Sequence, residues 1–248
     1  MSDGMIAHDE WNYSPPKLAK MPIIELGSIK GVLPFDGVRN PGSRSSTSHK
    51  VWFGYRTPAN DWQIQLGICE SAAEFAVALE ALMSPNIYDV KFQPMTVRFA
   101  LDGKQRHYTH DLLVVYKCGF RQLIFVRNGK SLKKPKTQRE IDAIFKATTA
   151  HQADGLIVVN ASDYSRQRRE NLFRMHQLLQ EDDPEADELV LSTARGLKTL
   201  WQMKDIFPHV DLDPWRVFRA CYRLVALKHL KADLDNVLLE TSRIEVAA

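Results

Sequence analysis

The chain has few cysteines and no long apolar run. Its 248 residues include three cysteines, Cys69, Cys118 and Cys221, which are far apart and form no C-x-x-C pair. Their apolar neighbours favour buried thiols in a reducing compartment. No stretch approaches the roughly 18 uninterrupted apolar residues of a membrane span, and residues 1–10 lack the basic and apolar regions of a signal peptide. We therefore expect a cytoplasmic protein that does not bind a membrane.

The chain also has no large excess of charge of either sign, since the net charge is only +3. With 44% hydrophobic and 25% charged residues, the chain can bury a core, which excludes a fully disordered or collagen-like protein. Its length fits one large domain or two smaller ones. Basic residues nevertheless cluster at Lys130, Lys133, Lys134, Lys136 and Arg139, at Arg166, Arg168 and Arg169, and at Arg216, Arg219, Arg223, Lys228 and Lys231. Such clusters favour a polyanionic partner, although many charge runs are simply solvated faces.

The hydrophobic pattern predicts an α/β fold with a mixed sheet. A helix is expected over residues 71–83, followed by closely spaced strands over 90–92, 95–101, 107–116 and 121–127. Thr137, with Glu140 three positions on, predicts the N-cap of a helix over 137–151. The apolar run at 155–160 predicts a strand that is covered on both faces.

We divide the chain into three parts. Residues 1–39 form an N-terminal arm, partly disordered, because prolines and scattered glycines prevent long regular elements. Residues 40–180 form the α/β domain, and an acidic run at 181–188 marks the boundary. Residues 185–248 form a mostly helical, winged-helix-like domain, with helices over 188–195, 200–207 and 213–226 and a small wing near 230–234.

The last of these helices has two distinct faces. Its apolar stripe is Trp215, Phe218, Tyr222 and Val225, which we expect in the core. Arg216, Arg219 and Arg223 lie on another face, one turn apart. This face suits either a recognition helix in a DNA groove or docking on an acidic protein.

Spaced motifs in the first domain carry the functional information. Asp111 stands within an apolar strand, where a carboxylate is costly unless it is paired or bound to a metal, or unless it lies at a strand end facing solvent. The motifs in order are Cys69-Glu70-Ser71-x-x-Glu74, Val90-x-Phe92-Gln93-Pro94, and Arg106-x-Tyr108-x-x-Asp111 followed by a hairpin. With a small, basic segment at 43–50, this arrangement over residues 40–160 resembles the TnsA-type transposon endonucleases.

The resemblance implies a restriction-endonuclease-like mixed sheet flanked by helices, and metal-dependent hydrolysis of phosphodiesters at transposon or other mobile-element DNA ends. By resemblance, Glu70 and Asp111 are metal ligands and Arg127 lies at the phosphate. The expected cofactor is Mg²⁺ or Mn²⁺, which takes oxygen ligands and generates hydroxide. The expected partners are DNA, a DDE-type transposase and an ATPase regulator.

One family motif is replaced in this chain. The family carries an acidic residue or Gln, then any residue, then Lys, where this sequence has Phe125-Val126-Arg127. Residues two apart on a strand share a face. Phe125 has no ligand atom, whereas Arg127 stays protonated and can hold a phosphate. Either a replacement ligand has moved in, from Glu74, Glu140 or Asp142, or cleavage is lost and a DNA-binding or transposition-assembly factor remains.

Two further features bear on function. The lysine-rich segment 128–139 leaves the last of these strands as a loop, and Lys130, Lys133, Lys134, Lys136 and Arg139 are predicted to contact DNA phosphates. A solvated lysine loop is the alternative.

His107 and His110 are three apart on a strand, so we expect one to face solvent and the other to pack, with no shared metal. A third functional hypothesis is a regulator that reads an operator through Arg219.

Overall fold

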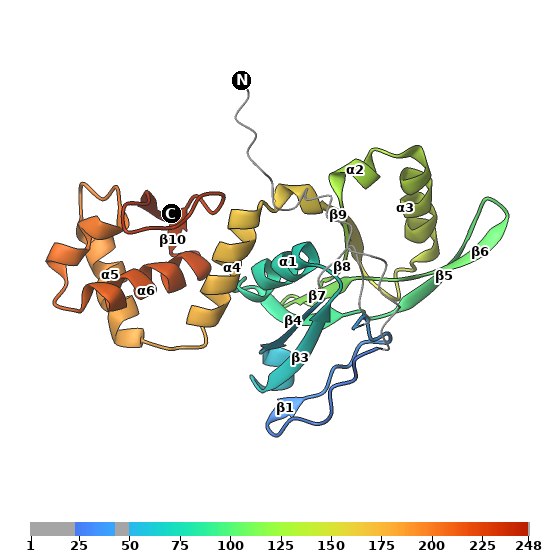
Figure 1. Cartoon of the computed structure of the whole chain (residues 1–248), viewed down its shortest axis with the longest axis horizontal. Helices are drawn as coiled ribbons and strands as arrows, with labels where there is room; N and C mark the ends of the chain where they lie inside the picture. The colour runs from blue at the N-terminus through green and yellow to red at the C-terminus, as the bar shows by residue number, and fades with distance from the viewer. Residues whose placement is uncertain (1–22, 43–49, 248) are drawn as a thin grey trace, which may run out of the picture.

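The protein is a mixed α/β chain with several sheets. The computed structural model describes residues 23–42 and 50–247. The expectations for residues 1–22 of the arm and for the basic segment at 43–49 lie outside the described residues. Figure 1 shows a sheet-containing body, a helical region at the C-terminal end and a long two-stranded ribbon at the opposite end.

The central sheet has the strand order β4-β7-β8-β9. It consists of β4 (Ile87–Phe92), β7 (Leu112–Tyr116), β8 (Arg121–Arg127) and β9 (Gly155–Asn160). The first three strands pair antiparallel and β9 pairs parallel to β8, which confirms the expected mixed sheet. The expectation that β9 is covered on both faces is wrong. This strand lies at the edge of the sheet, and Ile157 is 39% exposed.

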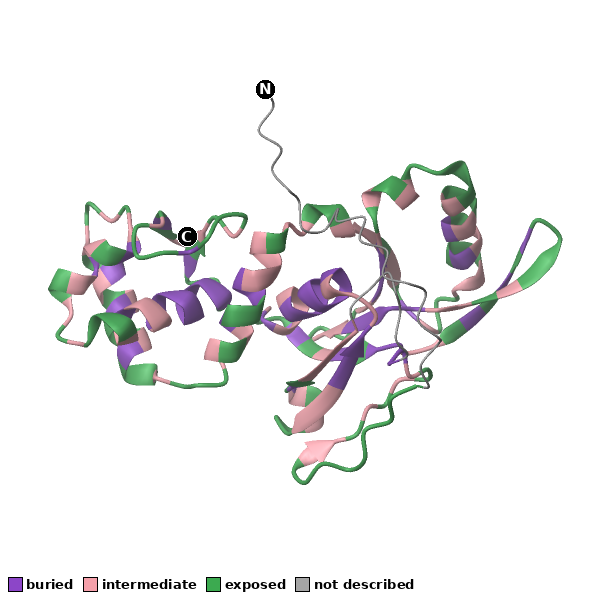
Figure 2. Cartoon of the chain, viewed as in Figure 1, coloured by how far each residue is buried: buried purple, intermediate pink, exposed green. Residues whose placement is uncertain are grey.

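Helices cover the two faces of this sheet. α1 (Ala72–Leu82) shares its core with Val114 and Val126, whereas α3 (Pro135–Ala147) packs with Phe125. Because neighbouring residues of a strand point to opposite faces, the two helices lie on opposite sides of β8. Figure 2 shows that α1 is buried along most of its length. The helix expected over 71–83 is confirmed, with Ser71 as its N-cap.

β5 (Thr96–Leu101) and β6 (Lys104–Thr109) form a separate two-stranded antiparallel sheet. The single strand expected over 107–116 is therefore wrong, because the chain breaks at residues 110–111. The His110 amide donates to the carbonyl of Met95 at 3.0 Å, and the Gln93 amide donates to the carbonyl of Asp111 at 3.0 Å. These two bonds mark where the chain leaves β6 and joins the central sheet as β7, beside β4.

A small sheet precedes α1. β2 (Val51–Tyr55) pairs antiparallel with β3 (Ile64–Cys69), and the two-residue β1 (Val32–Leu33) pairs parallel to β3. A 3₁₀ turn, Pro58–Asn60, lies between β2 and β3. The described part of the N-terminal arm thus has one short strand, which agrees with the expected lack of long regular elements.

The C-terminal region consists of α4 (Arg166–Leu178), α5 (Pro184–Gly196), α6 (Pro214–Ala226) and the hairpin of β10 (Leu230–Ala232) with β11 (Ile244–Val246). Its buried side chains belong to the same core cluster as those of α1. The division of the chain near residues 181–185 stays a prediction.

The helix expected over 200–207 is wrong. The chain forms 3₁₀ turns at Met203–Asp205 and Phe207–His209 instead. Its backbone pairs with the segment before β11, since the Met203 amide donates to Ser242 at 3.2 Å and the Ile244 amide donates to Trp201 at 3.0 Å. The preceding helix begins at Pro184, capped by Asp183, rather than at residue 188.

The arginine face expected on α6 is neutralised within the chain. Arg216 pairs with Asp183 at 2.9 Å, Arg223 pairs with Asp187 at 2.7 Å, and Arg219 pairs with Glu181. The acidic run at 181–188 thus faces these arginines. The geometry therefore does not support a role for them in binding a DNA groove or in docking on an acidic protein. The apolar stripe is buried at Tyr222 and Val225, but its first member is not in the core, since Trp215 is 61% exposed.

The expected burial of the cysteines holds for two of the three. Cys69 and Cys221 are buried, but Cys118 is exposed in the turn between β7 and β8, so the expectation of buried thiols is wrong at that position. Within residues 23–42 and 50–247, no helix is long and apolar enough to cross a membrane.

Candidate functional site

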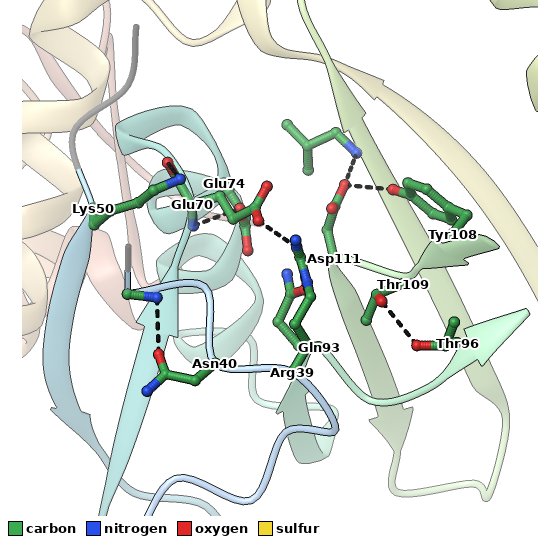
Figure 3. Close-up of polar contacts among 12 residues, drawn as sticks. Arg39, Asn40, Lys50, Glu70, Glu74, Gln93, Thr96, Tyr108, Thr109 and Asp111 are labelled. Atoms are coloured by element: carbon green, nitrogen blue, oxygen red, sulfur yellow. Dashed lines mark hydrogen bonds and ion pairs between the residues drawn. The ribbon is translucent and has the colours of Figure 1, made fainter. Parts of the chain in front are cut away.

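Three carboxylates gather where β3, α1 and the break before β7 meet (Figure 3). Asp111, just before β7, is 4% exposed. Its Oδ2 accepts hydrogen bonds from the Tyr108 hydroxyl at 3.0 Å and from the Val126 amide at 2.9 Å. The sequence placed Asp111 within a strand, and its position at a buried strand start explains why it needs these donors.

Glu74 is the second carboxylate and is 3% exposed. It lies in the first turn of α1, where its amide donates to the Ser71 hydroxyl at 3.1 Å. Its Oε2 accepts the Glu70 amide at 2.8 Å. Its Oε1 is buried and has no hydrogen-bond partner among the described residues. A buried carboxylate oxygen without a donor is costly, so this atom marks a place where a cation or a proton would be stabilised.

Burial shifts the pKa of both buried carboxylates upward. Burial, followed by the Asp111 charge, raises the pKa of Glu74 well above its usual range, and the Glu70 amide and the Gln93 side chain oppose this rise. Burial likewise raises the pKa of Asp111 to about 6, against the opposing effects of Arg127, the Val126 amide and the Tyr108 hydroxyl. Two nearby acids in a low-dielectric site favour a positive charge between them.

Glu70, the third carboxylate, is already neutralised. Arg39 of the N-terminal arm pairs with it and also donates to Gln93 Oε1 through Nη2 at 2.7 Å. The arm is held there because the Val38 amide donates to the Gln93 carbonyl at 2.9 Å. Lys50 Nζ donates to the Glu70 carbonyl at 3.2 Å. Glu70 is therefore less suited than Glu74 to ligate a cation.

Phe125 and Arg127 share one face of β8, as expected. The Arg127 guanidinium lies 4.1 Å from the centroid of the Phe125 ring and 5.3 Å from that of Tyr108. Its Nη1 lies 3.8 Å from Asp111 Oδ2. Phe125 is fully buried in a cluster with Val97 and Ile144, so it is a packing residue. Arg127 stays partly exposed beside the acids, where it can meet a phosphate.

The replacement ligands expected on α3 do not join Glu74. Glu140 and Asp142 belong to the helix on the opposite face of the sheet from α1. Asp142 is exposed and lines a depression between α3 and β5. Of the three candidates, only Glu74 lies within electrostatic reach of Asp111.

The lysine-rich segment is helical rather than a loop. It forms α2 (Gly129–Leu132) and the first turns of α3, which is capped at Lys134 with Pro135 in its first position, not at Thr137. Pro135 is preset for a helix start, which moves the boundary forward. Lys130, Lys133, Lys134 and Lys136 are exposed, and Arg139 pairs with Asp102 at 3.6 Å. The lysines directly follow the strand that carries Arg127.

The expectation that one histidine faces solvent and the other packs is confirmed. His107 is exposed and His110 is buried, with its Nε2 3.3 Å from the Thr148 hydroxyl. Burial lowers the pKa of His110 to about 4. In the part of the chain that the structure describes, no group of three or more His, Cys, Asp and Glu side chains is arranged to hold a metal ion.

Comparison with known proteins gives no family. No family model matches the chain, and no curated protein matches it. The side chains described above are thus the basis for any statement about function.

Sequence reasoning missed part of the site. Arg39 and Gln93 were not predicted as site residues, and Glu74 was named only as a replacement. Glu74 had a signal, because a Glu three positions after an N-cap Ser reaches back toward the preceding backbone. Arg39 had none, since it lies in irregular chain 31 positions before Glu70.

The Asp111 carboxyl predicts a pH dependence of folding. Its pKa is about 6 in the folded chain against an ordinary value of 3.8, so the folded state binds this proton more tightly. The stability that it contributes is fully present below about pH 4 and is lost as the pH rises through about 6. Between about pH 4 and 7, the free energy of unfolding should fall by roughly 2–3 kcal/mol more in the wild type than in Asp111→Asn. Urea titrations at four pH values measure this, and parallel curves for the two proteins would contradict it.

Proposed function

We propose that this chain is a metal-dependent DNA endonuclease subunit, similar to the TnsA type, that acts at the ends of a transposon or other mobile element. In this proposal the sheet and its helices are a restriction-endonuclease-like fold and the C-terminal region is winged-helix-like. One observation carries the proposal. Glu74 and Asp111 are two buried acids, and the Asp111 charge raises the pKa of Glu74. Arg127 lies beside Asp111 at the end of β8, and the lysines of α2 and α3 follow it.

Glu74 and Asp111 fit a hard divalent cation. Glu74 Oε1 is a buried oxygen without a donor among the described residues. Mg²⁺ usually binds through one or two carboxylates, with waters and substrate phosphates completing its coordination. A pair of carboxylates therefore suffices for Mg²⁺ or Mn²⁺, and in this proposal Glu74 takes the role that the resemblance implied for Glu70.

The chain's own groups have separate roles in this proposal. The metal supplies Lewis acidity and an activated water when bound. The Tyr108 hydroxyl and the Val126 amide hold Asp111 in place, and the Glu70 amide holds Glu74. Arg127 contacts a phosphate oxygen, because a guanidinium matches phosphate geometry and keeps its charge.

A DDE-type transposase and an ATPase regulator are proposed as partners on the resemblance alone. The arginines of α6 are engaged by Glu181, Asp183 and Asp187, so they do not supply a surface for an acidic partner. For the same reason, operator reading through Arg219 has no support in the geometry.

A second candidate is a catalytically impaired nuclease-fold protein that serves as a DNA-binding or transposition-assembly factor. Phe125 favours it, because a buried ring stands where the family carries a ligand. Arg39 on Glu70 and Arg127 beside Asp111 favour it as well, since each guanidinium neutralises an acid without a metal.

Nicking of supercoiled plasmid separates the two candidates. The endonuclease proposal predicts metal-dependent nicking by the full chain, with its partner proteins if these are required, and loss of nicking in Glu74→Gln. The second candidate predicts duplex binding that depends steeply on salt, needs no metal and is unchanged in Glu74→Gln. That second pattern, with no nicking under any metal condition, would overturn the endonuclease proposal.

The exposed lysines predict phosphate contacts that are independent of sequence. Replacing Lys133, Lys134 and Lys136 together with alanine should weaken binding to a random duplex, and the slope of log affinity against log salt should fall by up to about 3. Fluorescence anisotropy over a salt series measures both quantities. Lys198→Ala with Lys204→Ala and Lys231→Ala, three exposed lysines of the C-terminal region, serves as the charge-matched control and should leave the slope within about 0.5 of the wild type. An unchanged slope in the triple variant would contradict the prediction.

A further inference from the structure

The ribbon formed by β5 and β6 is a distinct element of the fold. It makes its own sheet and extends away from the body (Figure 1). Val97, Phe99 and Leu101 are buried in a cluster that includes Ile141 and Ile144 of α3. One face of the ribbon is therefore fixed on α3, so its position relative to the rest of the molecule is set by packing.

The other face is open and polar. Arg98 is the cross-strand partner of His107, Ala100 of Gln105, and Thr96 of Thr109. The first two pairs are exposed, and the two threonine hydroxyls lie 2.8 Å apart at the base of the ribbon (Figure 3). Arginine, glutamine and threonine are side chains that read base edges, and a small residue such as Ala100 permits close approach.

Positive charge concentrates around the ribbon. Residues 96–109 and 128–148, which cover the ribbon and α2–α3, hold nine lysines and arginines against three aspartates and glutamates. Their net charge is thus +6, whereas the whole chain carries +3. A depression of about 540 Å³ at the seam between the ribbon and α3 is lined by Arg98, Arg139 and Lys146, with Asp142. Arg98 belongs to the open face of the ribbon, and Arg139 and Lys146 of α3 lie across the seam from it.

We infer that the β5–β6 ribbon enters the major groove of double-stranded DNA, with Arg98, Gln105 and His107 facing the base edges and the basic residues of α2 and α3 contacting the flanking phosphates. This inference rests on the proposed function and names the form of nucleic acid and the element that reads it. The major groove is about 12 Å wide and admits a two-stranded ribbon. Six residues per strand give the ribbon a reach of roughly 20 Å.

Base contacts and phosphate contacts make different predictions. A residue that reads bases changes affinity and discrimination, whereas a residue that holds a phosphate changes the salt dependence. Arg98→Ala with Gln105→Ala and His107→Ala should therefore weaken binding to a guanine-containing duplex by about tenfold or more while leaving the salt slope within about 1 of the wild type. The variant that replaces Lys133, Lys134 and Lys136 with alanine should instead lower the salt slope and leave the discrimination between base sequences unchanged.

The test uses the full chain, a labelled duplex of about three helical turns and dimethyl sulfate footprinting, which reports guanine N7 in the major groove. We expect the wild type to protect guanine N7 atoms and the ribbon variant to lose this protection. Ala100→Glu is a second variant, since it adds a negative charge on the open face without touching the buried face, and it should also lose protection. Lys198→Ala with Lys204→Ala and Lys231→Ala controls for loss of charge.

The outcomes separate the inference from the proposed function. Unchanged affinity and footprint in both ribbon variants, with binding lost in the lysine variant, would overturn the ribbon inference and leave DNA binding intact. No duplex binding by the wild type at about 50 mM salt, where phosphate contacts are strong, would overturn both. Loss of protection in both ribbon variants with the control intact would support the inference.

Discussion

Asp111→Ala is expected to lower the rate of metal-dependent nicking by at least about 100-fold, because it removes one of two carboxylates that we assign to the cation. It should also lower the free energy of unfolding by about 1–3 kcal/mol. The alanine leaves the Tyr108 hydroxyl and the buried Val126 amide without an acceptor, and Arg127 without its acid. Plasmid nicking and urea unfolding measure the two effects.

Two further variants separate chemistry from folding. Asp111→Asn keeps an oxygen acceptor, so it should retain more stability than alanine and still lose nicking. Asp89→Asn is the matched control, because Asp89 is another partly buried carboxylate that accepts the Val90 amide at 2.9 Å and lies in β4. It should nick like the wild type. Nicking by Asp111→Asn at the wild-type rate would show that this carboxylate is not part of the reaction.

Arg223→Ala is expected to destabilise the C-terminal region by about 2–3 kcal/mol. This is less than the roughly 3–5 kcal/mol for breaking a fully buried pair, because the Asp187 side chain left without its partner is 21% exposed. Arg223 is 2% exposed, and its Nη2 lies 2.7 Å from Asp187 Oδ1. The side chain also crosses from α6 to α5, so its loss weakens the packing of these two helices. Denaturant unfolding followed by circular dichroism measures the change.

Arg216→Ala is the comparison for this effect. Arg216 also pairs with the acidic run, through Asp183 and Glu185, but its own side chain is 39% exposed. Exposed ion pairs contribute roughly 0–1 kcal/mol, so this variant should unfold nearly like the wild type. Equal losses in the two variants would contradict the claim that burial, rather than ion pairing as such, makes Arg223 important.

Elements that are fixed by nearby residues were predicted well, whereas elements that depend on contacts between distant residues were not. α1 and α6 were predicted well, because Ser71 and Asp213 cap them and their apolar positions recur at helical spacing. The start of α3 was misplaced, since Pro135 supplied a stronger start than the Thr137 capping pattern. The 3₁₀ turns near residues 203–209 could not be predicted, because distant backbone at residues 240–244 accepts and donates the local hydrogen bonds.

The candidate site also depends on contacts between residues that are far apart in the sequence. Asp111 and Arg127 were expected at one site from the resemblance, and Arg127 Nη1 lies 3.8 Å from Asp111 Oδ2. The expectation for α6 failed because the sequence does not show that Glu181, Asp183 and Asp187 fold back onto its arginines. Arg39 was missed for the same reason, since the arm reaches Gln93 only in the folded chain.

Calorimetric titration of Mn²⁺ tests most directly whether Glu74 and Asp111 form a cation site. The titration uses the wild type, Glu74→Gln and Glu70→Gln, each with a duplex that carries a non-hydrolysable phosphorothioate so that substrate phosphates can complete the coordination. Our account predicts one class of site in the wild type, its loss in Glu74→Gln, and affinity within about threefold of the wild type in Glu70→Gln, because the Glu70 carboxylate is already paired with Arg39. Equal binding by the wild type and Glu74→Gln, or no binding by the wild type, would contradict it.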